Sequence, residues 1–103
     1  MNMNDYQAKA GEFALYEDQF YPIASLSVEA NELMDLFVKP VLRGDDKEIN
    51  MDELISEAGD VLWNLSCLLE DNGITLQEVA SKNIAKLASR MERGVIQGDG
   101  GDR

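Results

Sequence analysis

The longest helical pattern in this chain lies in the middle of the sequence and constrains the fold more than any other feature. Residues 51–71, MDELISEAGDVLWNLSCLLED, repeat apolar side chains at helical spacing and contain no proline. Asn50 and Glu53 form a capping box before them, and Gly73 stands where a left-handed residue usually closes a helix. We therefore predict one long helix over these residues.

Two further helix signals precede this segment. Asn4 and Gln7 have the spacing of a capping box, which predicts a short helix that ends near Leu15. Apolar residues then recur at helical spacing over residues 23–38, and Pro40 cannot continue a regular helix. The sequence therefore predicts a second helix from about residue 23 to residue 38.

A fourth helix is predicted after the long one. Thr75 and Glu78 cap it, and Gly94 ends it. The glycine-rich residues 95–103 that follow have no periodicity. No convincing strand pattern is present, so the predicted class is all-α, with a domain of four main helices over 1–94 and a tail over 95–103.

Size and composition limit what such a domain can do. A chain of 103 residues buries only about 60 to 65 % of its unfolded surface, so we expect the helical bundle to be completed by oligomerisation. The net charge of −11 disfavours binding to nucleic acid or to anionic membranes. There is no apolar run near 20 residues and no signal peptide pattern, so we expect a soluble cytoplasmic protein.

The inventory of reactive side chains is narrow. The chain has no histidine, which excludes histidine-based catalysis and histidine metal ligands. The single cysteine, Cys67, has no partner for an internal disulfide and is predicted to pack in the core. Any chemistry must therefore come from carboxylates, amines or hydroxyls.

Two pairs of carboxylates stand at helical spacing inside predicted helices. Glu29 and Glu32 share one face of the second helix, and Glu57 and Asp60 share one face of the third. If the helices pack along the adjoining apolar stripes, four carboxylates meet, and their repulsion favours a bridging Mg²⁺ or Mn²⁺. The alternative from geometry alone is that these are ordinary surface acids.

The same residues resemble a known family. Glu29-x-x-Glu32, a gap of 24 residues and Glu57-x-x-Asp60 are similar to the E-x-x-E…E-x-x-D signature of MazG-type nucleoside triphosphate pyrophosphohydrolases. NDYQ, GITLQEVASKNIAKLASR and ERGVIQGDGGDR also resemble the small single-domain MazG-like proteins, so the resemblance covers nearly the whole chain. Val28 departs from it, because many relatives read E-E-x-x-E.

The resemblance implies Mg²⁺-dependent hydrolysis of a nucleoside triphosphate to the monophosphate and pyrophosphate. The metal would be held by Glu29, Glu32, Glu57 and Asp60, and Mn²⁺ could replace Mg²⁺ there. Glu32 is our choice for the residue that orients or deprotonates the attacking water. The preferred base and sugar stay open, as do the number of metal ions and a role in pool cleansing or in supplying one monophosphate.

Candidate substrate ligands lie mainly in the fourth helix and the tail. The predicted phosphate-binding residues are Asn83, Lys86, Arg90 and Arg103, with Lys39 and Lys82 as weaker candidates. Arg103 would contact phosphates if the tail closes over the substrate. Asn64 and Trp63 are weak candidates for binding the base, and Trp63 is also expected as a core or interface aromatic.

We expect the chain to form a homo-oligomer. The resemblance suggests a homodimer, or a homotetramer built as a pair of dimers, with a two-fold interface. Part of the substrate site would then come from a neighbouring subunit, with the tail best able to reach across. The rival classes are a non-catalytic metal-binding protein and a helical homo-oligomeric interaction module, and an enzyme for one particular nucleotide is the closest alternative within catalysis.

Overall fold

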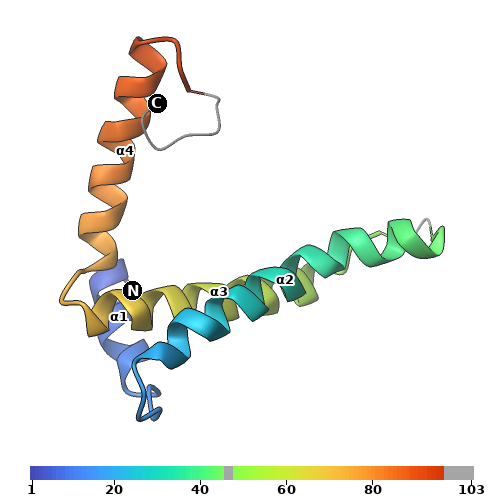
Figure 1. Cartoon of the computed structure of the whole chain (residues 1–103), viewed down its shortest axis with the longest axis horizontal. Helices are drawn as coiled ribbons and strands as arrows, with labels where there is room; N and C mark the ends of the chain where they lie inside the picture. The colour runs from blue at the N-terminus through green and yellow to red at the C-terminus, as the bar shows by residue number, and fades with distance from the viewer. Residues whose placement is uncertain (46–47, 97–103) are drawn as a thin grey trace.

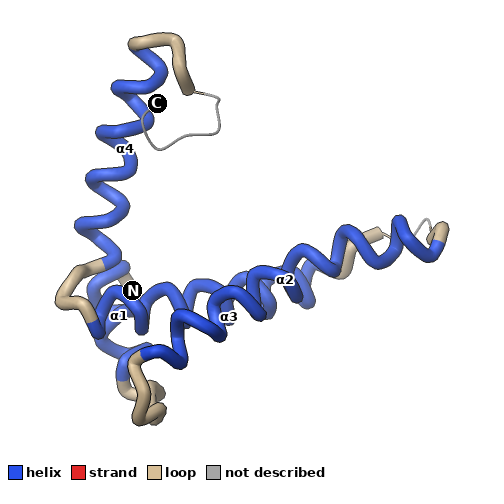
Figure 2. Tube along the Cα trace, viewed as in Figure 1, coloured by secondary structure: helices blue, strands red, loops and turns tan. Residues whose placement is uncertain are grey.

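A computed structural model of the chain describes residues 1–45 and 48–96, and every regular element within these ranges is a helix (Figure 2). The helices are α1 (Met3–Gly11), α2 (Phe20–Arg43), α3 (Met51–Asp71) and α4 (Leu76–Glu92). The all-α class predicted from the sequence is therefore confirmed. None of the described helices is long and apolar enough to span a membrane.

The main packing unit is the hairpin of α2 and α3, which run antiparallel side by side (Figure 1). α1 packs against the second half of α3, where the Trp63 indole nitrogen donates to the Ala10 carbonyl at 3.1 Å. The Tyr16 hydroxyl, in the connection to α2, donates to a carboxylate oxygen of Asp71 at 2.7 Å. These contacts join α1 and the connection before α2 to the second half of α3.

The start of α1 corrects one sequence prediction. The N-cap is Asn2, whose side chain accepts from the backbone N–H of Asp5 at 2.8 Å, and not Asn4 with Gln7. Gln7 is instead buried and joins the α3–α4 turn, where it donates to the carbonyl of Ile74 and accepts from the N–H of Leu76. A distant contact therefore decides the role of a residue that has capping-box spacing.

The length of the first helix was also overestimated. α1 ends at Gly11, while the prediction placed its end near Leu15.

α2 extends beyond both predicted ends. Pro22 lies in its first turn, where backbone N–H groups have no intrahelical partner in any case. Pro40 lies inside the helix, so the prediction of an end near residue 38 was wrong. Gly44, at φ 72°, closes the helix with two C-terminal bonds, from Asp45 N–H to the Pro40 carbonyl and from Gly44 N–H to the Val41 carbonyl. This cap stabilises a last turn that the proline alone disfavours.

The predicted N-cap residues of α3 and α4 are confirmed, although among the described residues the reciprocal bond from the Asn50 N–H to the Glu53 side chain is absent. The Asn50 side chain accepts from the N–H groups of Asp52 and Glu53, and Thr75 accepts from the N–H of Glu78. Gly73 takes the predicted left-handed conformation, at φ 70°. Both helices therefore begin and end close to where their local signals place them.

The single chain is open. α4 projects away from the α2–α3 hairpin (Figure 1), and the radius of gyration is 16.5 Å, against about 13 Å for a compact domain of this length. Among the described residues the buried hydrophobic side chains are Ala10, Cys67 and Leu76. A core of this size leaves most apolar side chains at least partly exposed, as expected for a chain that assembles with others, although the assembly itself stays a prediction.

Candidate active site

The antiparallel α2–α3 hairpin brings acidic residues from both helices together. One carboxylate oxygen from each of Glu29, Glu57 and Asp60 lies within 4.8 Å of the others. Glu29 comes from α2, and the other two lie three residues apart on one face of α3. Three of the four predicted metal ligands therefore converge, through the helix pairing that the sequence analysis assumed.

The electrostatics of this group are unfavourable without a cation. Burial raises the pKa of Glu29 above its ordinary value, and the negative charges of Glu32, Asp60 and Glu57 raise it further. The pKa of Glu57 is raised in the same way, first by burial and then by Glu32 and Asp60. Glu32 thus acts on both residues, which places it beside the cluster although its own carboxylate is more exposed.

Two oxygens in this group are also left without donors. The Oε2 atoms of Glu29 and Glu57 are buried and have no hydrogen-bond partner in the described part of the chain. Buried carboxylate oxygens are normally paired, because losing water without a replacement costs free energy. Hard oxygen donors that converge and lack partners fit a divalent cation such as Mg²⁺ or Mn²⁺.

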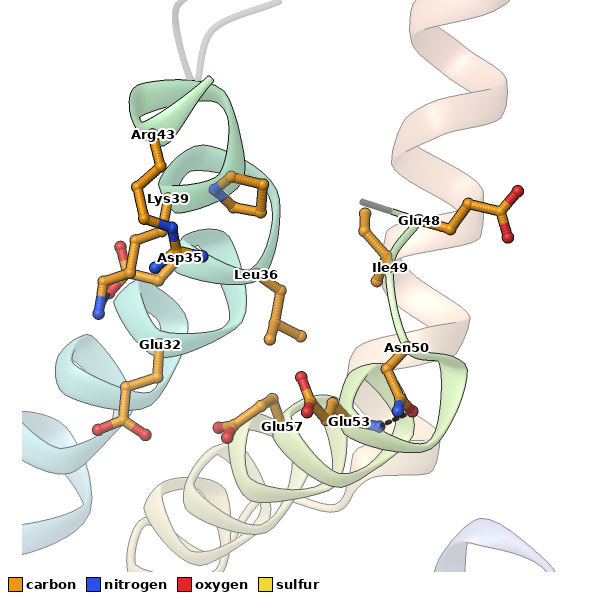
Figure 3. Close-up of a pocket in the computed structure, with 11 residues that line it drawn as sticks. Glu32, Asp35, Leu36, Lys39, Arg43, Glu48, Ile49, Asn50, Glu53 and Glu57 are labelled. Atoms are coloured by element: carbon orange, nitrogen blue, oxygen red, sulfur yellow. Dashed lines mark hydrogen bonds and ion pairs between the residues drawn. The ribbon is translucent and has the colours of Figure 1, made fainter. Parts of the chain in front are cut away.

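A cleft of about 730 Å³ adjoins the cluster and contains Glu32 and Glu57 (Figure 3). It lies between the second half of α2 and the start of α3. Its lining residues are Glu32, Asp35, Leu36, Lys39, Pro40, Arg43, Glu48, Ile49, Asn50, Glu53 and Glu57. The volume is in the range of small-molecule sites, and one end of the cleft carries the carboxylates.

Two cations on α2 line the same cleft (Figure 3). Lys39 Nζ lies 3.4 Å from a carboxylate oxygen of Asp35, and Arg43 Nε lies 3.2 Å from one of Asp45. Lys39 was predicted as a weaker phosphate ligand, and the structure places it beside the acidic residues. Both ion pairs are exposed, so each cation can exchange its carboxylate for a ligand at little cost.

Four charged residues that line this cleft, Asp35, Arg43, Glu48 and Glu53, were not among the predicted site residues. Arg43 follows Lys39 by one helical turn, but the predicted helix end at residue 38 placed it in a loop. Asp35 follows Glu32 by three residues, and Glu53 precedes Glu57 by four, so the same helical spacing could have identified both.

The phosphate-binding residues predicted on α4 do not reach this cleft within one chain. Lys82, Asn83, Lys86 and Arg90 lie on the helix that projects away from the hairpin. Lys82 Nζ pairs with Glu78 on its own helix at 3.3 Å. Arg90 is only 6 % exposed, and its Nε has no hydrogen-bond partner among the described residues. Arg103 and most of the tail lie outside the described residues.

The two predicted base-binding residues lie on α3 beyond the acidic pair. Trp63 uses its indole N–H to bind the Ala10 carbonyl, so part of its ring supports the α1–α3 contact. Asn64 is 2 % exposed and donates to the Asp60 carbonyl at 2.8 Å, while its Oδ1 has no described partner. Base binding by either residue stays a prediction.

One protein-family model matches most of the chain. The model of the MazG nucleotide pyrophosphohydrolase domain matches residues 22–95, which include nearly all of α2, all of α3 and α4, and the three converging carboxylates. The chain belongs to the MazG nucleotide pyrophosphohydrolase family. The MazG match therefore covers the acidic cluster and its cleft, while α1 lies outside the matched residues.

The chain is also similar to one curated protein over its full length. The chain is 36 % identical over 115 aligned positions to the Gene 37 protein of Mycobacterium phage L5, and the alignment covers all of both chains. The name of this relative states no activity. No solved structure matches this MazG-family chain at a significant level.

Proposed function

We propose that the protein is a Mg²⁺-dependent nucleoside triphosphate pyrophosphohydrolase that converts a nucleoside triphosphate to the monophosphate and pyrophosphate. The observation that carries this proposal is the convergence of Glu29, Glu57 and Asp60, with two buried oxygens that lack donors, beside an open cleft. The MazG family match supports the reaction type.

The positions of the acidic residues suggest separate roles in metal binding and in activation of water. Glu29, Glu57 and Asp60 would hold the cation at the α2–α3 contact, and Glu32 would lie beside them on the cleft side. When bound, Mg²⁺ neutralises phosphate charge and lowers the pKa of a coordinated water. Glu32 and Asp60 are both exposed, but of these two only Glu32 lines the cleft, so Glu32 is the better placed to orient the attacking water and accept its proton.

The cleft would bind the triphosphate in one orientation. Its acidic end would take the α phosphate, because Glu32, which would orient the attacking water, lies there. Lys39 and Arg43 lie further along α2 and would bind the phosphates that leave as pyrophosphate. Attack at the α phosphorus breaks the bond between the α and β phosphates, so the products would be the monophosphate and pyrophosphate, with no orthophosphate.

Product analysis with a set of substrates tests this proposal. The protein is incubated with Mg²⁺ and each of the eight common ribonucleoside and deoxyribonucleoside triphosphates, and phosphorus NMR identifies the products. We expect pyrophosphate and a monophosphate from at least one substrate, and loss of that activity in Asp60→Asn. Glu70→Gln, an exposed acid on the same helix and outside the cluster, is the matched control and should retain activity.

The same experiment separates the rival functions. Orthophosphate as the only inorganic product would contradict the pyrophosphohydrolase assignment. Metal binding without turnover of any triphosphate would instead indicate a non-catalytic metal-binding protein, and the absence of both would leave a helical interaction module.

A further inference from the structure

A second cavity lies near the end of α3 that is farther from the cleft, between α1, the connection from α1 to α2 and the last turns of α3. Its volume is about 330 Å³, which is within the range of small-molecule sites. Of the described residues, none lines both this cavity and the cleft beside the acidic cluster. The cavity is therefore separate from the candidate active site.

Ser66 is a polar residue of this cavity that lacks a partner. It is 1 % exposed and lines the cavity, yet its hydroxyl forms no hydrogen bond with any residue that the structure describes. Buried hydroxyls are normally hydrogen-bonded, because losing water without a replacement costs free energy. The Ser66 oxygen is therefore positioned to bind a polar group that enters the cavity.

The charged groups around the cavity show which sign of ligand it fits. Glu17 comes from the connection before α2, and Glu70 and Asp71 come from the end of α3. No lysine or arginine is among the described residues that line the cavity. A ligand that carries phosphate or carboxylate groups would be repelled there, whereas a cation is attracted by all three side chains.

The arrangement of these acids does not fit a metal ion. In the described part of the chain, the one group of three or more candidate ligand atoms within 4.8 Å is that of Glu29, Glu57 and Asp60. Glu70 and Asp71 are adjacent in the sequence, so their side chains leave α3 about 100° apart. Carboxylates spread around a cavity suit an extended organic cation better than a compact metal ion.

Tyr16 provides an aromatic wall for the cavity. Its ring stacks on Tyr21, with centroids 5.5 Å apart and planes inclined by 19°, and its hydroxyl donates to Asp71 at 2.7 Å. Burial raises the pKa of Tyr16, and the hydrogen bond to Asp71 raises it further, so the hydroxyl stays protonated as the donor. Aromatic rings attract ammonium groups, and the ring and the buried Cys67 also offer apolar surface to methylene groups.

We propose that this cavity is a binding site for a short aliphatic diamine. One ammonium group donates to the Ser66 hydroxyl and to the Asp71 carboxylate, since an ammonium has three donors and no acceptor. The methylene chain packs on Tyr16 and Cys67, and the second ammonium lies near the exposed Glu17. This proposal does not depend on the proposed function, because it uses none of the residues of the acidic cluster or its cleft.

Calorimetric titration of the full chain tests the ligand class. The probe is 1,4-diaminobutane, and the neutral 1,4-butanediol and the anionic succinate have the same chain length without the positive charge. The titrations are made at about 0.15 M salt, which screens attraction to the acidic surface as a whole, with Mg²⁺ present to compete for the acidic cluster. We expect saturable binding of one diamine per chain and no binding of the diol or of succinate.

Variants of the cavity test the site. Asp71→Asn should weaken diamine binding at least about tenfold, and Ser66→Ala about threefold or more. Glu92→Gln is the matched control, because it removes one negative charge from an exposed position on α4 that does not line the cavity. It should change the affinity less than about twofold.

Tyr16→Phe separates direct binding by Asp71 from a structural role. This variant keeps the aromatic ring and removes the hydroxyl that donates to Asp71, so it should retain diamine binding within about threefold. Equal losses in Tyr16→Phe and Asp71→Asn would mean that Asp71 acts only by holding Tyr16, and would overturn the proposal. Comparable binding of the diol or of succinate, an equal loss in Glu92→Gln, or no saturable binding of the diamine would also overturn it.

Discussion

Glu29 of α2 and Glu57 of α3 each have a buried carboxylate oxygen without a hydrogen-bond donor in the described structure, and both belong to one group of oxygens within 4.8 Å. They come from two helices whose pairing forms the main contact of the chain. The fold therefore holds two repelling carboxylates together.

Without metal, stability should decrease as pH rises. The folded-state pKa of Glu57 lies above the ordinary value of 4.5, so between those two values the folded chain holds a proton that the unfolded chain has lost. This stabilising contribution is complete below pH 4.5 and disappears as pH rises through the raised pKa. Glu57→Gln should therefore make the metal-free chain more stable than wild type at pH 7, with a smaller difference at pH 4. Urea unfolding in EDTA measures this, and Glu70→Gln should show no such pH-dependent gain.

Binding of Mg²⁺ or Mn²⁺ should offset the repulsion between the clustered carboxylates and stabilise the folded chain. A cation that binds only the folded chain raises the free energy of unfolding, and at about a hundred times its dissociation constant the melting temperature should rise by roughly 10 °C. Asp60→Asn removes one of the three converging ligands and should lose most of this rise. Thermal melts in Mg²⁺, Mn²⁺ or EDTA compare the melting temperatures of wild type and Asp60→Asn. A wild-type melting temperature that neither metal changes would contradict a clustered site.

Glu32→Gln should separate metal binding from turnover. Glu32 lines the cleft but lies outside the group of three closest ligand atoms, so the variant should bind Mn²⁺ within a few-fold of wild type. Its turnover should fall at least about a hundredfold if Glu32 orients the attacking water and accepts its proton. Calorimetric titration with Mn²⁺ and steady-state kinetics report the two effects independently, and normal turnover would assign that role to another carboxylate.

Arg43→Ala should weaken substrate binding more than catalysis. Arg43 lines the cleft away from the acidic end, and a charged hydrogen bond to phosphate is worth about 1.5 to 3 kcal/mol. We expect KM to increase about tenfold or more with kcat changed by less than about threefold. Lys9→Ala, at an exposed ion pair on α1, is the control. Equal kinetics for Arg43→Ala and wild type would remove Arg43 from the phosphate site.

Subunit mixing should show whether α4 serves a neighbouring cleft. Within one chain α4 projects away from the hairpin, so Arg90 cannot meet the same chain's Asp60 in this arrangement. An inactive Asp60→Asn chain mixed with an inactive Arg90→Ala chain should recover part of the activity if sites are shared. No recovery despite demonstrated subunit exchange would mean that each site takes both residues from a single chain.

Local signals in the sequence were sufficient for much of the fold. Asn50, Thr75 and Gly73 act on backbone groups within a few residues, so the limits of α3 and α4 followed from their identities. The two acidic pairs were recognisable because residues three apart share a helix face. That periodicity depends on the chain alone and does not require knowledge of what packs against it.

Features that depend on distant contacts were mispredicted or missed. Gln7 has capping-box spacing, but its hydrogen bonds go to the turn at residues 74–76. Pro40 disfavours a helix locally, yet the cap at Gly44 continues α2 for another turn and brings Arg43 to the cleft. The role of Gln7 is thus decided by a contact more than 60 residues away, whereas the end of α2 is decided by a glycine four residues beyond Pro40.

Local periodicity and caps specify a helical chain with two acidic pairs at helical spacing. The meeting of Glu29 with Glu57 and Asp60 comes from the packing of α2 on α3, because the register of two antiparallel helices depends on side chains along both of them. The tertiary structure also places α4 away from the hairpin, which separates Asn83, Lys86 and Arg90 from the cleft of their own chain. Helix formation is encoded within a few residues, whereas the meeting of two helices depends on packing over the whole hairpin.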